Sequence, residues 1–87
     1  PVMAVDTVLR GSGGEQAGLQ PGDILAKIGS RAWPAVGEGV DEIQSHAGKP
    51  IDLVVLRGGA LIPITAQVSS KGTIGFSVGE GWAAPIM

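Results

Sequence analysis

Alternating and β-branched apolar positions predict five strands along the 87-residue chain, separated by stretches rich in glycine and proline. The first strand is expected to be largely buried. Pro63 cannot donate a hydrogen bond to a neighbouring strand, so its segment is expected at a sheet edge or with a bulge. The five expected strands cover residues 2–9, 24–28, 51–56, 61–68 and 73–78.

One amphipathic helix is predicted between residues 36 and 47. Acidic residues gather toward its start, where negative charge suits the helix dipole. Gly48 is placed to end the helix in a left-handed conformation, and Pro50 prevents its continuation. Four apolar residues recur on one face of this helix: Val36, Val40, Ile43 and Ala47.

Turn residues divide the remaining chain. Residues 11–14 are expected to form a loop, and residues 15–18 form one helical turn at most, which Gly18 can end. Pro21-Gly22 predicts a type II turn, and the following Asp23 is expected at the surface, accepting hydrogen bonds from nearby backbone N–H groups.

Two further turn signals complete the expected fold. Gly58-Gly59 predicts a tight hairpin. Pro34 favours an extended backbone at Trp33, which we interpret as a cap at the edge of the core. Together these elements predict an α+β domain: a small, partly open barrel of five or six strands, capped by one main helix and one short helix.

Composition and charge limit the possible functions. The net charge of −2 argues against nucleic acid or an anionic membrane surface as a partner. Cysteine is absent, and a lone histidine, His46, cannot form a metal site without other ligands, so a surface role at the helix end is expected for it. No sequence sign of a partnered base accompanies Ser12, Ser69 or Ser70, which argues against nucleophilic catalysis. Because the chain opens at Pro1 rather than at methionine, we expect it to be a piece of a longer protein.

Two segments resemble bacterial PDZ domains. The run Ala17-Gly-Leu-Gln-Pro-Gly-Asp-Ile-Leu25 is similar to the short helix and following strand of that family, with Gly13-Gly14 in place of the usual Pro-Ala. This replacement is expected to weaken the short helix. Thr73-Ile74-Gly75-Phe76 resembles the family's Gly-Leu-Gly-Phe loop, with threonine in place of the first glycine. Its position near the end of the chain resembles the circularly permuted order of bacterial members.

The resemblance implies a groove between the last strand and the main helix. In the family, a peptide C-terminus adds to that strand, and backbone N–H groups of the loop receive its carboxylate. Gly75 is expected to leave room for the carboxylate, and Lys71 to add positive charge nearby. An alternative is that the loop is only a turn before a core strand and that the helix packs the core. The resemblance implies these peptide-binding residues: Lys71, Thr73, Ile74, Gly75, Phe76, Ser77, Val78, Val40, Ile43 and Gln44.

Further runs are similar to site-2-type intramembrane zinc metalloproteases, the family of the regulator of sigma-E protease. These are Trp33, Gly48-Lys-Pro-Ile51, Val54–Gly59 and Gly72–Phe76. The likeness implies a PDZ domain over residues 1–79 and a tail, residues 80–87, that leads into the rest of the parent protein. Trp82 in that tail is a candidate contact to the parent's membrane domain or to the bilayer interface.

The same likeness implies a location and a role. Such domains lie on the periplasmic or extracytoplasmic side, next to the transmembrane catalytic domain, and filter substrates for regulated intramembrane proteolysis. Zinc and its HExxH motif belong to that membrane domain and are absent from this sequence, so this chain is not expected to be an enzyme. The alternatives are the PDZ module of a periplasmic serine protease of the high-temperature-requirement or C-terminal processing type, and a steric spacer that binds no peptide.

Overall fold

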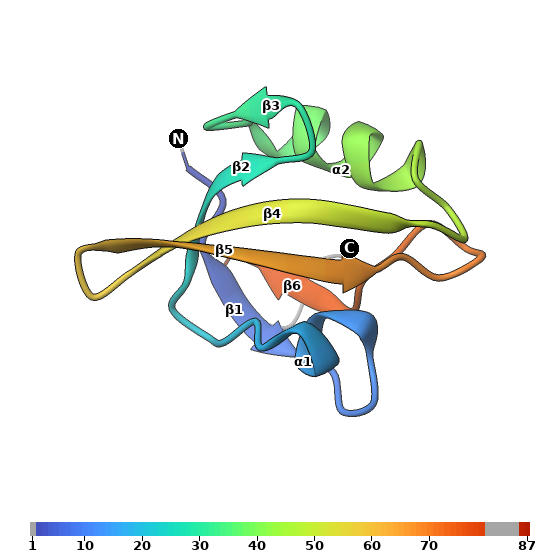
Figure 1. The fold of residues 1–87 in the computed structure, drawn as a ribbon, viewed down its shortest axis with the longest axis horizontal. Helices are drawn as coiled ribbons and strands as arrows, with labels where there is room; N and C mark the ends of the chain where they lie inside the picture. The colour runs from blue at the N-terminus through green and yellow to red at the C-terminus, as the bar shows by residue number, and fades with distance from the viewer. Residues whose placement is uncertain (1, 80–85) are drawn as a thin grey trace.

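The computed structural model describes residues 2–79 and 86–87, which form a small α+β fold with six strands in two sheets (Figure 1). One sheet has the order β3-β2-β4-β5, the other pairs β1 with β6, and every pairing is antiparallel. The elements are β1 (Val5–Val8), α1 (Gly13–Ala17), β2 (Ile24–Ile28), β3 (Arg31–Ala32), α2 (Val36–Gln44), β4 (Pro50–Arg57), β5 (Ala60–Gln67) and β6 (Phe76–Val78).

The two sheets do not close into a barrel within the described residues. A bridge between Ala4 and Ile24 joins the start of β1 to the start of β2, while β6 pairs with β1 alone among the named strands. The expectation of a mixed domain is confirmed, and the expectation of a partly open barrel is replaced by two sheets around a shared core. None of the helices in residues 2–79 has the length and hydropathy that a membrane span needs.

The β4–β5 hairpin forms as its sequence predicts. Gly58 and Gly59 both have positive φ, +56° and +79°, which a primed hairpin turn requires. Arg57 then pairs with Ala60, and the register continues to Pro50 opposite Gln67. β5 is an edge strand, as Pro63 indicated, because its other side has no partner strand in the described sheet.

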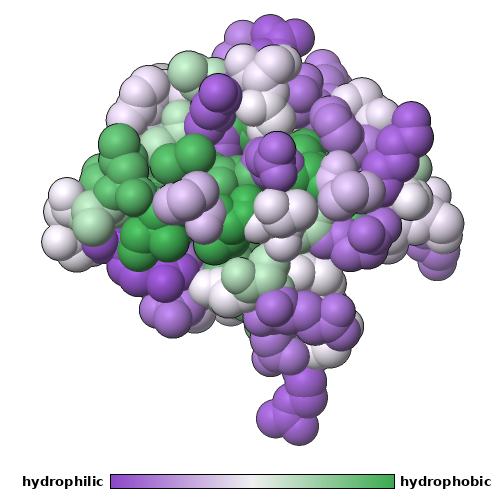
Figure 2. All heavy atoms as spheres, in the orientation of Figure 1, coloured by the Kyte–Doolittle hydropathy of each residue, from purple (hydrophilic) through white to green (hydrophobic). Residues whose placement is uncertain are grey.

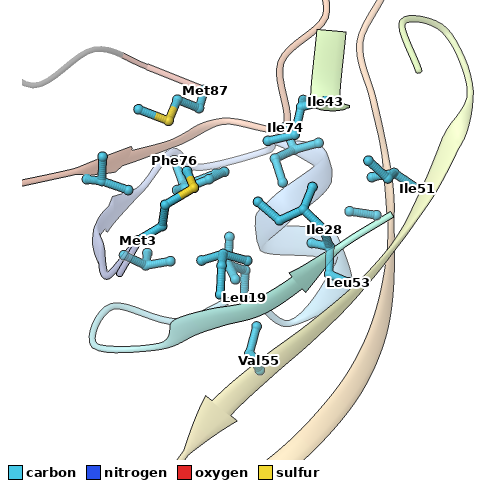
Figure 3. Close-up of a cluster of buried hydrophobic side chains, with 14 of the residues drawn as sticks. Met3, Leu19, Ile28, Ile43, Ile51, Leu53, Val55, Ile74, Phe76 and Met87 are labelled. Atoms are coloured by element: carbon cyan, nitrogen blue, oxygen red, sulfur yellow. The ribbon is translucent and has the colours of Figure 1, made fainter. Parts of the chain in front are cut away.

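The core lies between the two sheets and α2. β4 follows the predicted alternation, since Ile51, Leu53 and Val55 are buried. β2 departs from it, because a register shift between Leu25 and Lys27 places Leu25 and Ala26 both inside. The buried cluster joins residues from both sheets and α2: Met3, Val5, Leu19, Leu25, Ile28, Ile43, Ile51, Leu53, Val55, Ala66, Val68, Ile74, Phe76, Val78 and Met87 (Figure 3).

The main helix is shorter than predicted and buries a different stripe. It ends at Gln44, so Ala47 and Gly48 lie in the following turn, where Gly48 has a φ of +76°. Val36 and Ala47 are exposed, whereas Gly39 and Ile43 are buried. Gly39 lies outside the predicted apolar stripe. A Cβ there would collide with the sulfur of Met3 and lie 3.1 Å from a methyl of Ile28, so a glycine lets the helix approach the core closely.

The short helix begins earlier than predicted, because Gly13 and Gly14 are helical rather than part of a loop. Ser12 is its N-cap, accepting the N–H of Glu15 at 3.1 Å, and Glu15 Oε1 accepts the N–H of Gly11 at 2.8 Å. These reciprocal bonds offset the low helix propensity of two glycines. Gly18 ends the helix with a φ of +91°, as predicted.

The expected positions of two residues, Asp23 and Trp33, are wrong. Asp23 is 1% exposed because Arg57, from the end of β4, covers it as a bidentate partner, with both N···O distances at 2.7 Å. Trp33 is 53% exposed and has a φ of +47°, so it neither caps the core nor adopts the extended conformation expected before Pro34. Its N–H donates to Ala26 O at 2.8 Å, and this bond across the β2–β3 turn prevails over the local preference.

Candidate functional site

Residues 73–76 form a loop that leads into β6 and is held from behind by the N-terminal part of the chain. The carbonyl of Ile74 accepts the N–H of Gly14 at 2.7 Å, and the carbonyl of Gly75 accepts the N–H of Leu9 at 2.8 Å. Both carbonyls are thus engaged with the N-terminal part of the chain, and the N–H groups of the loop have a different partner. The residues before and inside α1 therefore determine the orientation of the loop.

Gly75 is required at the centre of this loop for two reasons. Its φ is +87°, a conformation that residues with a Cβ rarely adopt. A Cβ at this position would also lie 2.7 Å from Ser12 Oγ and still closer to Ser12 Cβ. The sequence-based reason for this glycine was room for a ligand, but the space beside Gly75 is occupied by the N-cap serine of α1.

The N–H groups of Ile74, Gly75 and Phe76 converge on one acceptor, the backbone oxygen of Met87. The N···O distances are 3.0, 2.7 and 3.1 Å. Three consecutive N–H groups that meet at one oxygen form a backbone nest, an arrangement that suits anionic or strongly polar oxygens. The loop is thus an oxygen-binding site, and the backbone oxygen of Met87 from the same chain occupies it.

The bound residues extend the β1–β6 sheet. The N–H of Met87 donates to Phe76 O at 2.7 Å, and Ile86 forms an antiparallel bridge with Ser77. Met87 is therefore held by backbone hydrogen bonds in both directions, as an added strand is. β6 receives β1 on one edge and residues 86–87 on the other, with Ser77 paired to Thr7 as well as to Ile86.

The two bound side chains have opposite environments. Met87 is 3% exposed and belongs to the buried cluster, at its margin near Phe76 (Figure 3). Ile86 is 46% exposed. This contrast follows from the strand geometry, in which successive side chains point to opposite faces. The side chain nearest the loop thus packs among buried apolar residues, and the preceding side chain faces outward.

The C-terminal end of α2 lies close to the loop. A Cβ on Gly72 would be 3.2 Å from the Cα of Gln44, so the backbones of α2 and of the residue just before the loop are in near contact. Ile43 is 1% exposed and shares the buried cluster with Ile74, while Val40 packs against that cluster. The helix and the loop therefore flank one region of the molecule.

Most of the predicted site residues come together around this loop. Ile74, Gly75, Phe76, Ser77 and Val78 are all buried, and Thr73 is half-buried. Ser77 directs its hydroxyl to the hydroxyl of Thr7 on β1. Gln44 and Lys71 are exposed. Sequence reasoning missed Leu9, Ser12 and Gly14, because their contacts with the loop join positions far apart in the chain, where no local pattern marks them.

An open hollow of about 380 Å³ adjoins the loop on the α1 side. It is lined by Leu9, Arg10, Gln16, Thr73 and Ile86, among others. Arg10 places a positive charge at the edge of this hollow, and Lys71 is not among its lining residues.

The ion pair between Asp23 and Arg57 has a structural role. Hydrogen bonds from the Arg57 guanidinium hold the pKa of the Asp23 carboxyl below its usual value, the Gln20 N–H assists, and burial opposes them. Arg57 also donates to Gly18 O at 2.9 Å, so the pair fastens the β4–β5 hairpin to the end of α1. Within residues 2–79 and 86–87, no three histidine, cysteine or acidic side chains gather in a way that suits a metal ion.

Comparison with known proteins relates the chain to a protease. No family model matches the sequence. The chain is similar to a protein of Vibrio cholerae serotype O1 named "Putative zinc metalloprotease", with 41% identity over 69 residues. The match covers 74% of this chain but only 15% of the Vibrio cholerae protein, so the chain corresponds to a small part of that relative. This similarity supports a relation to that protein's family.

Proposed function

We propose that the chain is a PDZ-type module that binds the C-termini of peptides or proteins in the groove between β6 and α2. The observation that carries this proposal is the position of residues 86–87, which pair with β6 and present a backbone oxygen to the loop. Three loop N–H groups hold the oxygen of Met87, Phe76 O holds its N–H, and the apolar cluster holds its side chain. The groove therefore offers main-chain pairing, an oxygen site and a side-chain pocket together.

The similarity to a zinc metalloprotease supports the choice of parent protein. We propose that the module serves an intramembrane metalloprotease of the site-2 type on the extracytoplasmic side, where it admits substrates that present a suitable terminus. Zinc and the cleavage chemistry would lie in the parent's transmembrane catalytic domain. The function of this chain would be selection of substrates, with no bond broken by its own residues.

The proposal is tested with a fluorescent peptide that ends in Pro-Ile-Met, the last three residues of the chain. Binding to the full chain is measured by anisotropy for the free acid, for the C-terminal amide, and for a peptide that ends in aspartate instead of methionine. Hydrogen bonds to a charged acceptor contribute about 1.5–3 kcal/mol, so the free acid should bind at least about tenfold more tightly than the amide. The aspartate peptide should bind more weakly than the methionine peptide, because the pocket is apolar.

The control variant is Leu61→Lys, since Leu61 lies on β5 and is 61% exposed. It should leave all three affinities unchanged. Equal binding of acid and amide would refute the oxygen site. No binding of any peptide to the folded chain, even when Met87 is replaced by aspartate, would refute the proposed function and favour the steric spacer.

A further inference from the structure

We propose that Ile86 and Met87 are a competing ligand for the chain's own groove, which a peptide must displace before it binds. This inference rests on the proposed function, because it concerns the regulation of the same groove. Its basis is that these residues engage every part of the site at once: the loop N–H groups, the edge of β6 and the apolar pocket. A peptide cannot use those groups while the two residues hold them.

The bound residues satisfy groups that are costly to leave without partners. Ile74, Gly75 and Phe76 are all buried, and their N–H groups find an acceptor in Met87 O. A buried N–H without a partner is strongly disfavoured. The pocket also gains a side chain that is 3% exposed. Occupied and empty grooves therefore differ in hydrogen bonding as well as in apolar burial, and this difference favours occupation.

The expected strength of this competition follows from tethering. A ligand joined to its site by a short connection acts at an effective concentration on the order of 1 mM. If the same two residues bound separately with a dissociation constant of about 100 µM, tethering would weaken the binding of an outside peptide about tenfold. Peptides that bind the groove weakly would be excluded, and only those with better complementarity would enter.

The two bound residues provide a matched pair of variants. Met87→Asp places a carboxylate in the apolar pocket and should release the segment. Ile86→Asp introduces the same charge one residue away, on a side chain that is 46% exposed, and should leave the segment bound. Both variants retain Phe76 and the complete loop, so neither removes a group that an outside peptide needs.

The experiment measures two properties of the full chain and of both variants. Amide chemical shifts of Ile74, Gly75 and Phe76 report occupation of the loop, and anisotropy with the Pro-Ile-Met peptide reports access for an outside ligand. The inference expects Met87→Asp to shift all three amides and to bind the peptide about tenfold more tightly than the unaltered chain. Ile86→Asp should match the unaltered chain in both measurements.

Each other outcome has a distinct meaning. Equal peptide affinity for the unaltered chain and Met87→Asp would overturn the inference and leave the proposed function standing. Absence of peptide binding in all three proteins would overturn the proposed function, and the inference with it. Loop amide shifts that change between about 20 µM and 1 mM protein would show that the segment binds a second copy instead, which would overturn the intramolecular form of the proposal.

Discussion

Replacing Gly75 by alanine distinguishes between two roles for this glycine. If Gly75 only clears space for a ligand, Gly75→Ala should weaken peptide binding and leave the fold intact. The structure indicates a different result, because the space is filled by Ser12 and the φ is +87°. We expect the substitution to destabilise the domain itself.

The magnitude has two parts. Placing a residue with a Cβ at this φ costs about 1–2 kcal/mol, and forcing a methyl group against Ser12 costs about 1–3 kcal/mol. The total of about 2–5 kcal/mol is large against the roughly 4–13 kcal/mol expected for a domain of this length. At about 4–8 °C per kcal/mol, the midpoint of thermal unfolding should fall by roughly 8–40 °C.

A second glycine isolates the contact with Ser12. Gly22 has a φ of +90°, and a Cβ there would meet no atom within 4 Å. Gly22→Ala should therefore cost only the conformational part, about 1–2 kcal/mol. Urea unfolding followed by circular dichroism gives the free energy of unfolding for both variants. If the two substitutions destabilise the chain equally, the contact with Ser12 contributes nothing and the argument for close packing fails.

Three other predictions concern the scaffold. Asp23 has a pKa lowered in the folded state, so its stabilising contribution is complete above its ordinary value of 3.8 and is lost as the pH falls through the folded value. The free energy of unfolding should therefore drop below about pH 4, and Asp23→Asn should show a flatter pH profile with a lower value at neutral pH; parallel profiles would contradict the ion pair. Ile43→Ala should cost about 2–5 kcal/mol in urea unfolding, and Val40→Ala less, because only Ile43 is fully buried; the reverse order would place the buried stripe of α2 elsewhere. Pro63→Val should add a donor to the exposed edge of β5 and increase concentration-dependent association in sedimentation velocity; an unchanged monomer would show that proline is not what protects this edge.

Local patterns predicted most elements of the fold. Alternating residues located β4, two adjacent glycines located its hairpin, and helical spacing located α2. The loop before β6 was located by the resemblance of Thr73-Ile74-Gly75-Phe76 to the PDZ loop, a family likeness and not a backbone preference. The other signals are short-range, because they depend on backbone preferences and on which face of one element is apolar.

The features that were missed depend on partners far along the chain. The burial of Asp23 depends on Arg57, which lies 34 residues later. The left-handed conformation of Trp33 depends on a bond to Ala26, and the need for Gly75 depends on Ser12. None of these partners leaves a mark in the neighbouring sequence, so a sequence pattern gives the candidate loop but not the contacts that orient it.

The pairing of β1 with β6 brings the beginning and the end of the fold together, with Val5 directly opposite Val78. The start of β1 and the end of β6 therefore lie side by side in this sheet. A host protein can carry such a domain as an insertion in one of its surface loops, because the two flanking segments need not move apart. Such a segment could be moved from one host loop to another without forcing the ends of the loop apart. The β1–β6 pairing already holds the two attachment points close together, so little further loop-closure entropy is lost.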